Sequence, residues 1–158
     1  MTPPAPRAIA IGSDHRGLPL KNFLKTTLTE LGMAIEDAGT CSAESSDYPL
    51  FAKAVARTVS EQRCERGVLI CGSGIGMAIV ANKFPGVRAA LCRTVEDARR
   101  SRQHNDANIL ALGEDTDPAA ARQLLKAWLE TPFDGGERHQ RRLAQLREIE
   151  EENFKNPR

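Results

Sequence analysis

The sequence of 158 residues has none of the features that would point to a membrane or to nucleic acid as a partner. It contains no apolar run of the roughly 20 residues that a membrane-spanning helix needs. Its 22 basic and 21 acidic residues leave a net charge of +1, which offers no electrostatic attraction to nucleic acid or to an anionic membrane surface. We therefore expect a soluble, cytoplasmic protein with neither partner.

Signals for metal binding and for secretion are also scarce. Only three histidines occur, and none of the four cysteines forms a C-x-x-C pair, so a structural zinc site is not expected. The start, MTPPAPR, lacks the apolar core of a secretory signal, and we predict a disordered lead-in over residues 1–6. Proteins without a secretory signal usually keep their thiols reduced. We interpret every cysteine except Cys71, that is Cys41, Cys64 and Cys92, as structural.

What the sequence does contain is a regular alternation of short apolar runs with segments of helical periodicity, over a length typical of one domain. Strands are predicted at residues 7–13, 33–39, 67–72, 87–92 and 108–113, and helices at 19–31, 49–60, 75–82, 95–102 and 118–130. Strands separated by helices pair in parallel through right-handed crossovers. We predict an α/β fold, a Rossmann-like three-layer αβα sandwich with a five-stranded parallel sheet, as a single domain over residues 7–152.

The C-terminal segment predicts one more helix, beginning near residue 138. It is strongly charged and carries Leu143, Leu146 and Ile149. Such a helical arm would dock on its own domain or on a partner subunit. Residues 153–158 are expected to form a flexible tail.

Polar residues gather where the predicted strands begin or end. In an open parallel sheet, ligands bind beyond the carboxyl ends of the strands. GSDHRG follows the first strand, CGSGIG follows the third, and RQHNDAN precedes the fifth. We expect these three clusters to lie where one ligand could touch them all.

The stretch ICGSGIGMAIVANK has the glycines of a phosphate cradle but not their usual spacing. Gly72, Gly74 and Gly76 form G-x-G-x-G, which matches neither the dinucleotide fingerprint nor the P-loop. The spacing still predicts a loop whose backbone N–H groups face an anion at a helix start. That anion is either a phosphate or an oxyanion formed during a reaction, unless the loop is only a tight turn.

Cys71 stands at the lip of this loop. A cysteine at the end of a strand is usually a small buried hydrophobe. The positive end of a helix nearby would favour its thiolate, which can act as a nucleophile or as a general base. Ser73, inside the loop, can add a hydroxyl hydrogen bond or can be an ordinary turn residue.

The sequence SDHRG places an acid, an imidazole and a guanidinium in succession. Asp14 and His15 could handle the protons of sugar hydroxyls, and Arg16 or His15 could meet a phosphate. The alternative is a helix cap formed by Ser13 or Asp14, with a histidine at the surface.

The two remaining clusters lie later in the chain. His104 and Asn105 offer a proton donor and an amide that can hold a carbonyl or a hydroxyl. Arg138 and Arg142 are four residues apart, so they share one helical face and could grip a phosphate. The alternative for this pair is a solvated basic face paired with Glu148.

Taken in order, these clusters resemble the type B ribose-5-phosphate isomerases, within a wider family that includes the galactose-6-phosphate isomerase subunits. The matching stretches run from Arg7 to about Ile149 and are IGSDHRG, DYPLFA, CGSGIGMAIVANK, GVRAA, SRQHNDANILALG and GGERHQRR. The resemblance implies interconversion of ribose 5-phosphate and ribulose 5-phosphate in the pentose phosphate pathway. That reaction is an aldose–ketose isomerisation through a cis-enediolate, with no metal and no other cofactor.

The resemblance also implies a role for each cluster. Cys71 would be the base that moves a proton between C2 and C1, and His104 the acid that opens the furanose ring with help from Asp14. The anion hole for the enediolate would be formed by Gly72, Ser73, Gly74, Ile75 and Gly76. Asn105 would contact the sugar. The phosphate would be held by His15, Arg138 and Arg142. The resemblance further implies a homodimer or homotetramer whose active sites combine residues of two subunits.

Two departures from the family pattern accompany the match. Ser73 stands where threonine is frequent, which keeps the hydroxyl, and Glu137 is inserted before the RHQRR stretch and lengthens the turn there. The alternatives are an isomerase of a tetrulose, allose or galactose phosphate, or a non-catalytic subunit that binds a sugar phosphate. The ring-opening role of His104 argues against a four-carbon substrate, which does not cyclise in this way.

Overall fold

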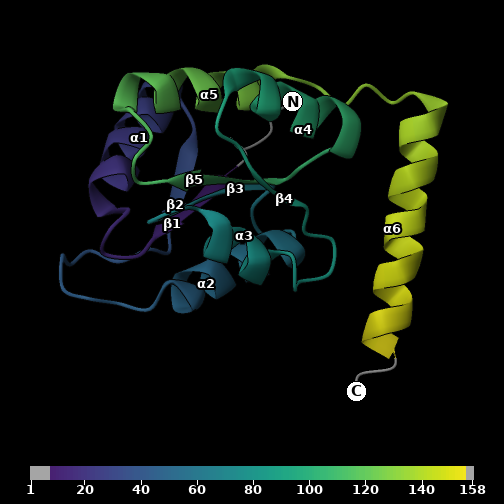
Figure 1. Cartoon of the computed structure of the whole chain (residues 1–158), viewed down its shortest axis with the longest axis horizontal. Helices are drawn as coiled ribbons and strands as arrows, with labels where there is room; N and C mark the ends of the chain where they lie inside the picture. The colour runs from purple at the N-terminus through teal and green to yellow at the C-terminus, as the bar shows by residue number, and fades with distance from the viewer. Residues whose placement is uncertain (1–7, 156–158) are drawn as a thin grey trace, which may run out of the picture.

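The computed structural model describes residues 8–155, which form a parallel sheet with helices on both faces (Figure 1). The strands are β1 (Ala8–Ser13), β2 (Ala34–Asp37), β3 (Arg66–Cys71), β4 (Ala89–Leu91) and β5 (Ile109–Gly113). The helices are α1 (Leu18–Glu30), α2 (Tyr48–Ser60), α3 (Ile75–Ala81), α4 (Val95–Asn105), α5 (Pro118–Glu130) and α6 (Glu137–Lys155). All neighbouring strands are parallel, in the order β2-β1-β3-β5-β4. The predicted fold class is confirmed.

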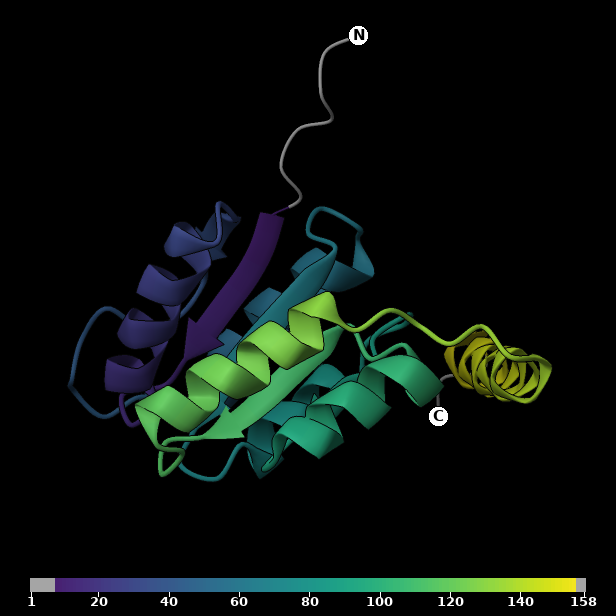
Figure 2. The same cartoon turned by 90° about the horizontal axis from the view of Figure 1, so that it is seen from above.

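The sheet is covered on both faces, as the nearly continuous apolar strands predict. Helices α1, α4 and α5 lie on one face and α2 and α3 on the other (Figures 1 and 2). Side chains alternate accordingly along β1, where Ile9 and Ile11 pack toward Leu24 of α1 while Ala10 packs toward Val55 of α2. Each face therefore has its own apolar core.

Helix α6 stands beside the body at the end of an extended linker (Figure 2). Of its residues, only His139 is buried, while Leu146, Ile149 and Phe154 are each about half exposed, at 47%, 55% and 49%. The helix begins at Glu137 and continues to Lys155, past the predicted domain limit at residue 152. Residues 1–6 of the predicted lead-in and 156–158 of the predicted tail lie outside the described part of the chain. None of the described helices combines the length and apolar character that crossing a bilayer requires.

The strand register decides which loops meet. Ser13 pairs with Ile70, and Cys71 pairs with Gly113, so the segments that follow β1, β3 and β5 converge at the carboxyl edge of the sheet. Helix α4 returns the chain from that edge to the opposite one, where β5 begins. Its cap is a capping box between Thr94 and Asp97, and it extends to Asn105, three residues beyond the predicted end at 102.

A buried lysine ties the loop after β2 to α1. Lys21 is 1% exposed, and its Nζ donates to both carboxylate oxygens of Asp37 at 2.9 and 3.0 Å and to the carbonyl oxygen of Thr40 at 2.7 Å. Lys25 donates to the same carboxylate from a more exposed position. Burial opposes the charge on Asp37, but the hydrogen bonds from Lys21 and Lys25 lower the pKa of its carboxyl. Lys21 thus anchors the start of the loop 38–47.

Replacing Lys21 is expected to cost far more stability than replacing Lys25. Lys21→Ala leaves a partly buried carboxylate with one partner fewer, at a cost of about 2–3 kcal/mol. Lys25→Ala removes a more exposed partner of the same carboxylate and should cost less than about 1 kcal/mol. Urea unfolding of the two variants measures the difference, and equal losses would contradict the anchoring role of Lys21.

Candidate active site

Each of the three alternating glycines of the loop 72–76 packs closely against a different neighbour. A Cβ at Gly72 would lie 2.9 Å from Nη1 of Arg16, and one at Gly76 would lie 2.6 Å from the ring of Tyr48. Gly74 has φ +76°, and a Cβ there would lie 2.8 Å from the backbone of Leu112 in β5. Position 74 therefore requires glycine, because it meets backbone and has positive φ, whereas positions 72 and 76 face the ends of two side chains.

Cys71 lies at the end of β3 with its sulfur directed into this loop. The residue is 5% exposed. The backbone N–H of Gly74 donates to Sγ at 3.2 Å, and the N–H of Ile75 donates to the hydroxyl oxygen of Ser73 at 3.2 Å. A sulfur that accepts a backbone N–H at the start of a helix is placed to carry negative charge.

The other cysteines differ from Cys71 in their surroundings. Burial raises the pKa of Cys64 and of Cys92 to about 11, so both are protonated thiols at neutral pH, in agreement with their predicted structural role. Cys41 is exposed in the loop 38–47, so the structural interpretation is wrong for this residue.

Asp14 and His15 follow β1 at the same edge. Oδ1 of the buried Asp14 accepts the backbone N–H groups of Arg16 and Gly17, both at 3.0 Å. These bonds hold the turn before α1, whose N-cap is Gly17 without a side-chain cap, so the alternative of a helix cap formed by Ser13 or Asp14 is wrong. Both bonds use Oδ1, so Oδ2 is the oxygen left for a ligand. Nδ1 of His15 accepts the backbone N–H of Ser46 at 3.1 Å, which places the ring proton on Nε2.

A second polar group forms where α4 ends and α6 begins. The ring of His104 stacks on that of His139, with centroids 4.6 Å apart and planes 7° apart. Nε of Arg138 donates to Nε2 of His139 at 3.3 Å. Burial lowers the pKa of His139, and the nearby charge of Arg138 lowers it further. The backbone N–H of Asp134 donates to the carbonyl oxygen of Gln103 and so ties the linker to α4.

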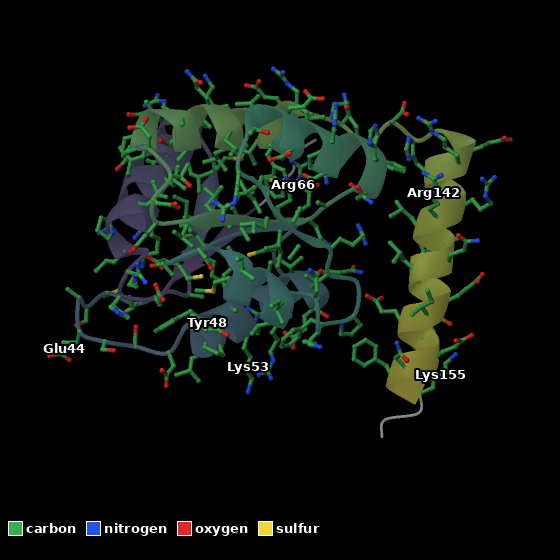
Figure 3. All side chains as sticks on the ribbon, in the orientation of Figure 1. Glu44, Tyr48, Lys53, Arg66, Arg142 and Lys155 are labelled. Atoms are coloured by element: carbon green, nitrogen blue, oxygen red, sulfur yellow. The ribbon has the colours of Figure 1, made fainter. Side chains whose placement is uncertain are left out.

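The predicted phosphate clamp belongs to this second group. Arg138 and Arg142 both lie in the first turns of α6, on one helical face, as their spacing predicts. Figure 3 shows Arg142 at the upper end of α6, well apart from Tyr48, whose ring lies against Gly76. The carbonyl oxygen of Asn105, at the end of α4, accepts from Nε of Arg88 at 3.0 Å.

The expectation that one ligand could touch all three polar clusters of a single chain is wrong. Cys71 lies at the carboxyl edge of the sheet, whereas His104 and Asn105 lie at the edge where β5 begins. The length of β5 alone, five residues, separates the two edges by about 15 Å. The sequence predicts that each cluster lies next to a strand, but it does not predict at which edge of the sheet the cluster lies.

Comparison with known proteins identifies the family of this chain. A family model described as Ribose/Galactose Isomerase matches residues 9–146. The chain belongs to the ribose/galactose isomerase family. Ribose-5-phosphate isomerase B of Escherichia coli is 42% identical to it, over 92% of this chain and 97% of that protein. A solved structure of ribose-5-phosphate isomerase B from Clostridium thermocellum superposes with a TM-score of 0.89 at 46% identity, covering 92% of this chain and 98% of the other.

Not every similar member of the ribose/galactose isomerase family carries the same substrate in its name. D-erythrulose-4-phosphate isomerase of Pectobacterium atrosepticum is 39% identical, over 82% of this chain and 86% of that protein. The predicted resemblance to the type B enzymes is confirmed, and the chain is a sugar phosphate isomerase of this family. The roles of the individual site residues stay predictions.

Three neighbours of the site are not predictable from local sequence patterns: Glu114, Ser46 and His139. Nη2 of Arg16 donates to Oε1 of Glu114, a residue 98 positions later in the chain. Ser46 fixes the ring of His15 and His139 that of His104. Their contacts join distant parts of the chain, so no local pattern announces them. His139 alone had a signal, since it lies inside the matching stretch GGERHQRR.

Gly74 should tolerate alanine far less well than Gly86 does. Both have positive φ, +76° and +74°, but a Cβ at Gly86 meets nothing within 4 Å. Gly86→Ala should therefore cost only the backbone strain, about 1–2 kcal/mol. Gly74→Ala adds a clash with the backbone of Leu112 and should lose both more stability and most of the catalytic activity. Urea unfolding and an isomerase assay measure the two effects; equal behaviour of both variants would contradict this account of the loop.

Proposed function

We propose that the protein interconverts ribose 5-phosphate and ribulose 5-phosphate. The observation that carries the proposal is the placement of the Cys71 sulfur, which accepts the N–H of Gly74 at the start of α3. Asp14 and His15 follow the neighbouring strand β1 at the same edge of the sheet, and each accepts a hydrogen bond from the backbone. This arrangement supports proton abstraction next to a carbonyl, the chemistry that an aldose–ketose isomerase needs.

The thiolate of Cys71 acts as the base in this mechanism. It removes the proton from C2 of the open-chain aldose, and the electron pair moves into the C1–C2 bond while the C1 carbonyl oxygen becomes an oxyanion. The backbone N–H groups of the loop 72–76 stabilise this enediolate. The thiol then returns the proton to C1, a carbonyl forms at C2, and the hydroxyl proton of C2 ends on the oxygen at C1.

Ring opening precedes the proton transfer and needs a separate acid. His104 supplies a proton to the ring oxygen, and Oδ2 of Asp14 accepts the proton of the anomeric hydroxyl. Because His104 lies at the opposite edge of its own sheet, it serves the Cys71 of a second copy of the chain. Arg138 and Arg142 reach the same site from the second copy, together with Asn105, and grip the phosphate with the His15 of the first.

Exposed apolar surfaces support this shared site. Ile75 and Ile79, four residues apart on α3 and directly after the Cys71 loop, are 48% and 57% exposed. A groove of about 630 Å³ lies between α6 and the body, and its walls include Leu146, Ile149 and Asn105. A two-fold dimer that seats α3 of each copy against α6 of the other buries these surfaces in an isologous interface. It also sets Cys71 of one copy beside His104 of its partner.

Other sugar phosphates define the second candidate function. The similarity to a D-erythrulose-4-phosphate isomerase favours a four-carbon substrate. The acid His104 favours a substrate that must be opened from a ring, as pentose and hexose phosphates must. The five-carbon substrate is therefore the one we propose.

Steady-state kinetics on matched four-, five- and six-carbon sugar phosphates, with a metal chelator present, tests the substrate. We expect kcat/KM to be highest on ribose 5-phosphate and Cys71→Ala to reduce kcat by at least about 10³-fold, as the loss of a catalytic base does. Cys92→Ala, at a buried cysteine outside the site, is the matched control and should retain activity. A higher kcat/KM on a tetrulose or hexose phosphate would overturn the ribose assignment, and an active Cys71→Ala variant would remove the thiol from the mechanism.

Mixing two inactive variants tests whether two copies share each site. In a dimer of one Cys71→Ala chain and one His104→Ala chain, one site receives both substitutions and the other receives neither. The purified heterodimer should therefore show about half of the wild-type activity, and an unpurified random mixture, half of whose dimers are heterodimers, about one quarter. Co-expression with two different tags and assay of the doubly purified dimer measures this recovery. Sites contained within single chains would stay inactive in every mixture.

A further inference from the structure

Arg16 lies at the mouth of the site, but the proposed mechanism gives this residue no role. It directly follows His15, and its guanidinium lies over Gly72, the residue after Cys71. Nη1 and Cζ lie 2.9 and 3.1 Å from the point where a Cβ of Gly72 would be. The side chain of Arg16 therefore spans from the proposed phosphate contact to the lip of the catalytic loop.

The partner of Arg16 is another residue of the same edge. Glu114 follows β5, and its backbone N–H donates to the carbonyl oxygen of Cys71 at 2.8 Å. Its Oε1 accepts from Nη2 of Arg16, and the two side chains are 57% and 28% exposed. The hydrogen bond to Glu114 raises the pKa of Arg16. Because an ion pair this exposed contributes little to stability, the guanidinium can exchange its carboxylate for another anion.

The charges of the carboxyl edge make such an exchange useful. The three segments that meet there, 13–17, 71–76 and 113–117, contain four carboxylates but only one arginine or lysine, which is Arg16. Asp14 and Glu114 are the carboxylates whose charges act on its guanidinium. A substrate phosphate that approaches this edge meets carboxylates unless Arg16 faces it, and a guanidinium binds phosphate through two parallel hydrogen bonds.

We propose that Arg16 binds the substrate phosphate from the same chain as Cys71, and that Glu114 holds its guanidinium in place until the substrate arrives. The inference rests on the proposed function for the identity of the substrate. Arg16 would thus complement, from the first copy, the Arg138 and Arg142 of the second. It would act on binding and orientation of the sugar phosphate, while the proton transfers remain with Cys71 and His104.

Inorganic phosphate is the probe that tests this role without relying on catalysis. Its dissociation constant, measured by calorimetry on the full chain, should rise about tenfold or more in Arg16→Ala, the effect of losing a charge-assisted hydrogen bond. Glu114→Ala frees the guanidinium and should bind phosphate more tightly than the wild type. Arg100→Ala removes an exposed arginine that pairs with Glu96 on α4 and should leave phosphate binding unchanged.

The double variant Arg16→Ala/Glu114→Ala shows whether Arg16 contacts the phosphate or only neutralises the charge of Glu114. If Arg16 touches the phosphate, the double variant still binds it clearly more weakly than the wild type, although better than Arg16→Ala because the unpaired charge of Glu114 is gone. Recovery of wild-type affinity in the double variant would mean that Arg16 only masks the charge of Glu114, and unchanged affinity in Arg16→Ala would exclude any role; either result overturns the proposal.

Kinetics on the sugar phosphate provides the second readout. Arg16→Ala should raise KM by a larger factor than it lowers kcat, whereas a larger fall in kcat would place Arg16 at the reacting carbons and overturn the phosphate role. If the wild type fails to isomerise ribose 5-phosphate, the proposed function fails, but the calorimetric comparison of the variants still decides whether Arg16 binds phosphate.

Discussion

Opposite directions of strand and helix are the constraint on which the rest of this molecule depends. In a parallel sheet each helix must carry the chain back, so a residue at the end of a helix lies at the edge where the next strand begins. Helix α4 places His104 at that edge, while β3 ends with Cys71 at the other. The sheet that positions both residues therefore also keeps them apart within one chain. A shared site between two copies resolves this separation without any change of fold.

The loop that follows β3 at the carboxyl edge lies close against three neighbours. Gly72, Gly74 and Gly76 face a guanidinium, the backbone of β5 and an aromatic ring, respectively. A side chain at position 74 would displace the loop and with it the N–H that meets the Cys71 sulfur. A nucleotide cradle uses glycines to admit a ligand, whereas here the glycines admit other parts of the protein. The same spacing thus holds the backbone N–H groups of the loop in place before the reaction. Stabilisation of a transient oxyanion requires such preorganised donors.

The fold was predictable because its signals are local. Short apolar runs, helical periodicity and their alternation fix five strands and six helices within a few residues, and the carboxyl-edge rule correctly picks Asp14, His15 and Cys71 as neighbours. The position of His104 does not follow from its place in the sequence, because a residue just before β5 lies where that strand begins and not at the carboxyl end where ligands bind. The pairs Arg16–Glu114 and His104–His139 join residues 98 and 35 positions apart. Such contacts depend on how the elements pack, and no pattern within one segment encodes them.

The stack of His104 on His139 shows how a cationic region can hold an imidazole acid in place. Two protonated rings in contact would repel each other, and Arg138 adds a further positive charge beside them. Burial lowers the pKa of His139, so at neutral pH this ring is neutral, and its Nε2 is free to accept the N–H of Arg138. His139 can therefore pack flat against His104 without adding charge. The stack fixes one face of the His104 ring and at the same time fixes the first arginine of the clamp, so the proposed acid and the proposed phosphate contact are oriented by a single buried side chain.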